Sequence, residues 1–155
     1  MSTATAIPAD LRLTRAFAAP RQIVFDAWTN PESLAQWWGP LGFTSTVHEL
    51  DPREGGAIRL HMRGPNGIEH PMTGQFVKVD PPRELVFTSA ALDTEGQPVF
   101  VNRNTVLFTE ISGGTEVTIH AEVMSFRPDA CQYLKGMEAG WTSSLERLSE
   151  LVAHR

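Results

Sequence analysis

Hydrophobic and polar residues alternate regularly in the middle of this 155-residue chain. Between residues 58 and 63, Ile58, Leu60 and Met62 occupy every second position, and Arg or His residues occupy the others. Because successive side chains of a strand point to opposite faces, this run predicts a strand with one buried face. Similar short runs, separated by Gly, Pro and Asn, extend from Phe43 to Ser125 and predict an antiparallel meander.

Two short helices are predicted between a first strand, which begins near Leu11, and this meander. Pro20 suits the first position of a helix that covers residues 21–28. Asn30 is a suitable N-cap for a second helix, which Gly39-Pro40 ends. Helices this short are unstable alone, so we expect them to pack as a brace at one end of the sheet.

The hydrophobic period becomes helical after Asp129 and stays so almost to the end of the chain. Apolar residues recur at spacings of three and four, which predicts one long amphipathic helix lying against the sheet. This stripe consists of Ala130, Leu134, Met137, Trp141, Leu145, Leu148 and Val152. Gly136 and Gly140 are unfavourable in a helix interior, so we expect a bend over a cavity at this point.

Together these elements predict one α+β domain, in which a curved antiparallel β-sheet wraps around a long C-terminal α-helix. We expect residues 1–10 to form a flexible tail and residues 11–155 to form the domain. The 41% hydrophobic and 20% charged residues are typical of an ordinary globular protein.

Charge and cysteine content narrow the choice of partners. The net charge of -5 disfavours binding to a phosphate backbone, so we expect no nucleic-acid partner. No apolar run is long enough to span a membrane and no secretory signal is present, which favours a cytoplasmic protein with no membrane partner. Cys131 is the single cysteine, permits no internal disulfide and is expected to be a small apolar filler in the helix.

Several motifs, taken in order, resemble those of a known family. They are the stretch from Arg15 to Trp28, Thr29-Asn30-Pro31, Trp37-Trp38-Gly39-Pro40, Gly55-Gly56, Asp80-Pro81-Pro82-Arg83-Glu84-Leu85 and Gly140-Trp141. On these motifs the chain resembles the bacterial proteins that are similar to the C-terminal domain of the Hsp90 ATPase activator. The resemblance covers nearly the whole chain beyond Leu11.

This family belongs to the START-like, or Bet v 1-like, SRPBCC superfamily. The resemblance therefore implies a helix-grip fold with a cavity between the sheet and the last helix. The superfamily includes lipid and hormone binders, polyketide cyclases and a self-sacrificing resistance protein, so the fold does not determine the activity. The chain has no counterpart of the separate N-terminal domain of the eukaryotic co-chaperones, and we do not expect it to activate Hsp90.

Adjacent tryptophans are the first candidates for the cavity. Neighbours on a helix point about 100° apart, so Trp37 and Trp38 cannot both enter the same core. The second ring either caps the helical brace or forms a lid at the cavity mouth. Met137 and Trp141 pose the same choice, because core packing and cavity lining both explain their spacing.

Polar residues interrupt the apolar run at 99–110. If Asn102 and Asn104 point inward, they can orient a ligand carbonyl; if Arg103 and Thr105 do, they can bind an anionic head group. The inward pair can also merely satisfy buried backbone and water. The predicted cavity residues are Trp37, Trp38, Leu60, Met62, Phe76, Phe87, Asn102, Asn104, Phe108, Ile119, Met137, Trp141 and Leu145.

The histidines do not predict a metal site, and we expect no cofactor. His48, His61, His70 and His120 are spread over predicted strands without close ligand spacing. Glu69 and His70 leave an acid-base enzyme open, although no nucleophile elbow, phosphate loop or paired-carboxylate motif is present. We therefore assign no catalytic residue.

The leading hypothesis is a protein that binds a small hydrophobic or aromatic ligand in an internal cavity, rather than an enzyme. One alternative is a cyclase-like acid-base enzyme that uses the same cavity. Another is an interaction module associated with Hsp90 in the stress response. A homodimer is a further alternative for the state of the chain in solution.

Overall fold

The computed structural model describes residues 10–130 and 136–153. Within them, seven strands form one antiparallel sheet in the order β1-β7-β6-β5-β4-β3-β2. The strands are β1 (Asp10–Phe17), β2 (Thr44–Leu50), β3 (Ala57–Arg63), β4 (Glu69–Asp80), β5 (Glu84–Leu92), β6 (Pro98–Ile111) and β7 (Gly114–Phe126). The helical elements are α1 (Arg21–Thr29), α2 (Pro31–Trp37), the 3-10 turn η1 (Pro128–Ala130) and α4 (Met137–Ala153).

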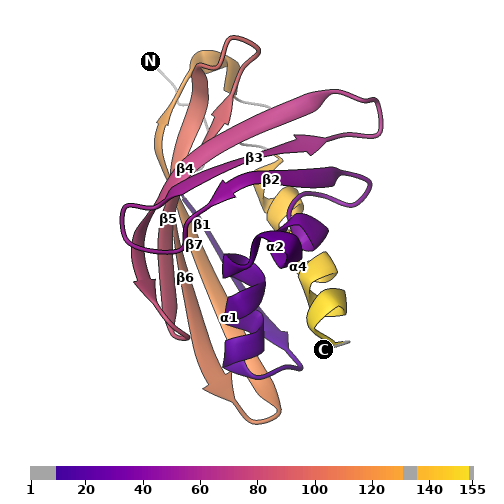
Figure 1. Ribbon diagram of the computed structural model, residues 1–155, viewed down its shortest axis with the longest axis vertical. Coiled ribbons are helices and arrows are strands. Elements are labelled where there is room, and N and C mark those ends of the chain that lie inside the picture. The colour runs from indigo at the N-terminus through magenta and orange to yellow at the C-terminus, as the bar shows by residue number, and fades with distance from the viewer. Residues whose placement is uncertain (1–9, 131–135, 154–155) are drawn as a thin grey trace, which may run out of the picture.

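The sheet is a meander whose last strand pairs with the first. Strands β2 to β7 follow one another along the sheet, and β1 runs antiparallel to β7. The sheet curls around α1, α2 and α4, which all lie on its concave side (Figure 1). The predicted α+β helix-grip architecture, with two short helices after the first strand, is confirmed.

Side-chain alternation explains which face of the sheet is covered. In β3, Ile58 and Leu60 are buried under the helices, whereas Arg59 is exposed on the convex face. In β7, Val117 and Ile119 have no exposed surface. Burying one face of each strand in this way fixes the register, because a slip by one residue would turn the apolar set outward.

The two short helices form as their capping residues predict. The Asn30 side chain accepts a hydrogen bond from the Ser33 backbone N–H at 3.1 Å, which caps the start of α2. This helix ends at Trp37, and the next residue, Trp38, is extended with ψ 131°. The chain then turns at Gly39, whose φ of 100° favours glycine.

The C-terminal helix begins later than the sequence pattern predicts. Ala130, expected in its apolar stripe, lies instead in η1 and is buried against Val99, apart from the main core. Leu134 and Cys131 lie outside the described residues. From Met137 onward the prediction holds, because Trp141, Leu145, Leu148 and Val152 are all buried. The tail predicted at residues 1–10 also lies outside the described residues, except for Asp10, which pairs with Glu122 in the sheet.

Candidate ligand-binding site

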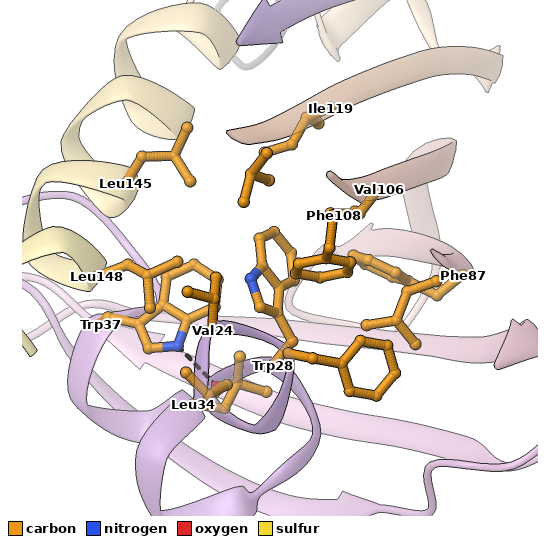
Figure 2. Close-up of a cluster of buried hydrophobic side chains, with 14 of the residues drawn as sticks. Val24, Trp28, Leu34, Trp37, Phe87, Val106, Phe108, Ile119, Leu145 and Leu148 are labelled. Atoms are coloured by element: carbon orange, nitrogen blue, oxygen red, sulfur yellow. Dashed lines mark hydrogen bonds between the residues drawn. The ribbon is translucent and has the colours of Figure 1, made fainter. Parts of the chain in front are cut away.

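The two adjacent tryptophans lie in different surroundings. Trp37 has no exposed surface, and its Nε1 donates a hydrogen bond to the Ala27 carbonyl at 2.8 Å. Its ring packs edge-on against Trp28, with centroids 4.6 Å apart. Figure 2 shows this ring among the side chains of Val24 and Leu148, so Trp37 is a core residue.

Trp38, by contrast, borders open space. α2 has already ended, and the Trp38 ring lies at the edge of the core, 5.7 Å from the ring of Trp37, 5.4 Å from that of Trp141 on α4 and 6.3 Å from that of Phe87 on β5. It is only partly buried and lines three neighbouring spaces between the helices and the sheet. The second ring was expected either to cap the helical brace or to form a lid at the cavity mouth. The position of Trp38 fits the lid.

The largest of these spaces, which we call the helix-side pocket, lies beside the first turns of α4 and has a volume of about 340 Å³. Its lining consists of Trp38, Gly39, Pro40, Met62, Ser89, Gly136, Met137, Gly140, Trp141 and Ser144. An added Cβ at Gly140 would meet no atom within 4 Å. The glycine therefore leaves open space between α4 and the end of α2.

A second space of about 260 Å³, the sheet-side pocket, lies over β3, β4 and β5. It is lined by Trp38, Pro40, Phe43, Met62, His70, Pro71, Met72, Ser89, Ala91 and Leu92. The two pockets share Trp38, Pro40, Met62 and Ser89, so they are adjacent. The Trp38 ring also borders a void of only about 20 Å³ in the core, against Leu60, Phe76 and Phe87.

One arginine on α4 holds the mouth of both pockets in place. Arg147 Nη1 donates to the carbonyl oxygens of Gly39 at 2.9 Å, Pro40 at 3.3 Å and Trp38 at 3.4 Å, and Nη2 donates to Gln36 at 2.9 Å. These carbonyls lie at and beyond the end of α2, where a helix leaves such groups without intrahelical partners. Partial burial lowers the pKa of the Arg147 guanidinium below its ordinary value.

Two serines of α4 complete this anchor. The Gly39 N–H donates to Ser144 Oγ at 3.0 Å, and the Leu41 N–H donates to Ser143 Oγ at 2.8 Å. Ser143 and Ser144, together with Arg147 one turn further along α4, thereby attach the segment that carries Trp38 to this helix. The sequence did not single out these residues; the available signal was two serines and an arginine at spacings of three and four beside the apolar stripe.

Ser89, which lines both pockets, belongs to a buried polar group of residues. Asn102 and Asn104 of β6 point inward with Ser89 of β5, whereas Arg103 is exposed. The open question of strand parity is thus answered in favour of the asparagines. Asn104 Nδ2 donates to Ser89 Oγ at 2.9 Å, and Asn102 Nδ2 lies 3.3 Å from Met137 Sδ.

The structure divides the residues predicted for the cavity into groups. Trp38, Met62, Met137 and Trp141 line the helix-side pocket, and Leu60, Phe76 and Phe87 border the small void. Asn102 and Asn104 are buried beside Met137 and Ser89. The remaining four, Trp37, Phe108, Ile119 and Leu145, belong to the packed core. Sequence reasoning missed Ser89, Pro40 and Phe43 among the lining residues.

Few charged side chains line the two pockets. Among the described residues that line them there is no Asp, Glu, Lys or Arg, and His70 is the titratable side chain. Nor do the described residues include three His, Cys, Asp or Glu side chains placed to hold a metal ion. His48 Nε2 and His61 Nδ1 share a hydrogen bond of 2.7 Å, and neither residue is among those that line the two pockets. No helix in residues 10–130 or 136–153 is both long and apolar enough to cross a membrane.

A curved sheet, a C-terminal helix across it and open space between them define the chain as a protein of the helix-grip class. The model of the family described as activator of Hsp90 ATPase homolog 1-like protein matches residues 18–153, and the chain belongs to this family. The fold is consistent with the SRPBCC superfamily. No curated protein matches the sequence.

Solved structures of bacterial proteins are similar along nearly the whole chain. A protein of Chromobacterium violaceum is 31% identical with a TM-score of 0.78, and the match covers 94% of this chain and 97% of that one. An AHSA1 protein of Silicibacter pomeroyi is 27% identical with a TM-score of 0.80, covering 94% and 98%. A protein of Arthrobacter aurescens is 25% identical with a TM-score of 0.86, covering 95% and 87%.

Proposed function

We propose that this protein binds a small, uncharged, hydrophobic or aromatic molecule in the helix-side and sheet-side pockets. The observation that carries the proposal is the open space beside Gly140, bordered by the rings of Trp38 and Trp141. Its volume of about 340 Å³ falls within the usual size of small-molecule sites, roughly 300–1,000 Å³. A cavity between sheet and helix is also a common binding site in this superfamily.

The chemistry of the walls supports an apolar ligand. Two indole rings supply flat surfaces on which an aromatic molecule can stack. Met62 and Met137 line the same space, and thioether side chains adapt to ligands of different shape. A charged ligand would lose its hydration without gaining a partner of opposite charge from the described lining residues.

A thermal-shift screen of uncharged aromatic compounds, with lipids and aromatic acids alongside, tests the proposal. A ligand at a hundredfold its dissociation constant stabilises a protein by about 2.7 kcal/mol, which is readily measured. We expect uncharged aromatic compounds to raise the melting temperature. No stabilisation by any apolar compound would contradict the proposal.

The variant Gly140→Phe shows whether a stabilising compound occupies this pocket. The new ring fills the space beside α4, so we expect the variant to fold and to lose the compound-induced shift. Ala139→Phe is the matched control, because Ala139 is exposed on the same helix. An unchanged shift in Gly140→Phe would place the binding elsewhere.

A further inference from the structure

Four residues line both pockets and therefore mark the junction between them. They are Trp38, Pro40, Met62 and Ser89. Trp38 and Pro40 belong to the segment that follows α2, whereas Met62 lies on β3 and Ser89 on β5. A molecule that extends from one pocket into the other must pass these side chains.

The side chain of Met62 reaches across this junction. A Cβ added at Gly39 would lie only 3.0 Å from Met62 Sδ, so the sulfur packs close to the backbone of Gly39. Gly39 has a φ of 100° and no side chain, which leaves room for the sulfur. Met62 thus connects the sheet to the segment that follows α2, at the place where the two pockets meet.

Met62 is also suited to move. The residue is only partly buried at the edge of the core. A methionine side chain is unbranched and has three rotatable bonds, so it adapts to the shape of a neighbouring molecule. A change of rotamer that withdraws the thioether from Gly39 widens the passage and joins the helix-side and sheet-side pockets into one elongated space.

The walls of the two pockets differ in character. The helix-side pocket is bordered by the indole rings of Trp38 and Trp141, whose centroids are 5.4 Å apart and which offer flat surfaces to an aromatic ring. The side chains that line the sheet-side pocket alone are mostly not aromatic. They are Pro71, Met72, Ala91 and Leu92, with Phe43 and His70. Such a lining suits a flexible alkyl chain, which needs no flat surface.

We infer that the ligand is elongated, with an aromatic ring in the helix-side pocket and an aliphatic chain that passes Met62 into the sheet-side pocket. Met62 is then the residue that determines which chains are admitted. This inference rests on the proposed function and adds the shape of the ligand to it. A compact ligand would fill one pocket and leave the apolar surface of the other in contact with water, which is unfavourable.

Equilibrium dialysis with two isomeric phenols tests the inference. In 4-n-octylphenol the alkyl chain is unbranched, whereas 4-tert-octylphenol carries the same atoms in a short, branched group. Both are uncharged at neutral pH. Each further CH₂ group that is buried corresponds to about a fourfold lower dissociation constant. Two such groups in the sheet-side pocket therefore suffice for our expectation that the linear isomer binds at least about tenfold more tightly.

Filling the sheet-side pocket should remove this preference. Ala91→Phe places a ring in that pocket, so the ratio of the two dissociation constants should fall to about twofold or less while 4-tert-octylphenol still binds. Ala90→Phe is the matched control, because the preceding residue of β5 points to the opposite face of the sheet. This variant should keep the full preference.

A second variant tests the passage itself. Met62→Phe replaces the flexible thioether by a larger and stiffer ring, and it should also reduce the preference to about twofold or less. Met124→Phe is its control, because Met124 is 61% exposed on β7 and lines neither pocket. Circular dichroism verifies folding, and Ala91→Phe with its control decides the matter if Met62→Phe does not fold.

The outcomes separate this inference from the proposed function. Equal binding of the two isomers, or a tenfold preference that survives in Ala91→Phe, would overturn the elongated ligand but leave an apolar site in one pocket. A preference that is lost in Ala91→Phe but survives in Met62→Phe would overturn the role of Met62. No binding of either isomer would contradict both the inference and the proposed function.

Discussion

Trp37 and Trp38 are consecutive residues, yet one belongs to the packed end of this domain and the other to the open end. At the packed end, α1 and α2 press aromatic side chains onto the sheet, and Trp28, Trp37 and Phe108 are all buried (Figure 2). At the open end, the start of α4 presents Met137 and Gly140 toward Trp38, and about 340 Å³ stays open. Space stays open on the side of Trp38 that faces Met137 and Gly140, although its ring also packs against those of Trp37 and Trp141.

The comparison explains what each end contributes. Protein interiors are packed about as densely as organic crystals, so the aromatic cluster at the packed end supplies stability. The open end gives up such contacts, because Gly140 has no side chain and an added Cβ there would touch nothing. We therefore expect substitutions at the packed end to change stability and substitutions at the open end to change binding.

Replacing Trp37 and Trp38 in turn should give the largest difference between the packed end and the open end. Trp37→Ala removes a fully buried ring and should lower the free energy of unfolding by about 3–5 kcal/mol. Trp38→Ala removes a partly exposed ring and should lower it by about 1 kcal/mol, while weakening binding of an aromatic compound about tenfold. Urea denaturation and equilibrium dialysis measure the two effects. Equal losses of stability would contradict the division into two ends.

The second prediction concerns the attachment of the pocket mouth to α4. Arg147→Met keeps much of the side-chain length but removes the donors to four carbonyl oxygens between Gln36 and Pro40. Hydrogen bonds to charged groups contribute roughly 1.5–3 kcal/mol when intact, so we expect a loss of about 2 kcal/mol for this partly exposed set. Hydrogen exchange should increase at residues 38–41 and stay unchanged in β7. A variant with wild-type exchange at the mouth would show that Arg147 does not hold it.

A substitution at Gly140 tests the open end through a gain of stability instead of a loss. Gly140→Ala adds a methyl group to a helix interior where nothing lies within 4 Å, and it should stabilise the protein by about 0.5–1 kcal/mol. Thermal and urea unfolding measure the gain. A destabilised Gly140→Ala variant would mean that the position is not open, and the packed and open ends would then not differ as described.

The smallest effect lies outside both ends, in the turn between β5 and β6. Asp93 accepts a hydrogen bond from Arg127 at 2.8 Å, and this guanidinium, with the Gln97 backbone N–H, lowers the pKa of Asp93 from 3.8 to about 2. Because the folded pKa is depressed, the stabilisation is complete above pH 4 and is lost as the pH falls towards 2. Melting temperatures at pH 7, 4 and 2.5 should show a small deficit of Asp93→Asn that is clearly reduced at the lowest pH. A deficit that does not change with pH would contradict an ionic origin.

Local sequence patterns were sufficient to predict most of the fold. The alternation in β3 and the apolar stripe from Met137 onward each reflect one face buried on one neighbour, which a periodic pattern records directly. Asn30 acts as the N-cap that its position suggested. The prediction that Ala130 belongs to the long helix was wrong, because an alanine in a single 3-10 turn can have the same spacing from the apolar stripe as an alanine in the helix.

The site was less predictable because it depends on where elements end and meet. The adjacent tryptophans separate only because α2 ends between them, and helix ends are poorly specified by hydrophobic period. Both strand parities at 99–110 carried polar residues, so the inward position of Asn102 could not be decided from alternation alone. Arg147 reaches carbonyl oxygens more than a hundred residues away in sequence, which no local motif records.

The most direct measurement is a nitrogen-15 correlation spectrum of the four tryptophan indole N–H groups during titration with an uncharged aromatic compound that stabilises the protein. Single Trp→Phe variants assign the signals. Binding in the open end should shift the signals of Trp38 and Trp141 strongly and that of Trp37, whose N–H is bonded to the Ala27 carbonyl, far less. If the Trp37 signal moves as much as that of Trp38, or if no indole signal moves at saturation, the ligand does not occupy the pocket described above.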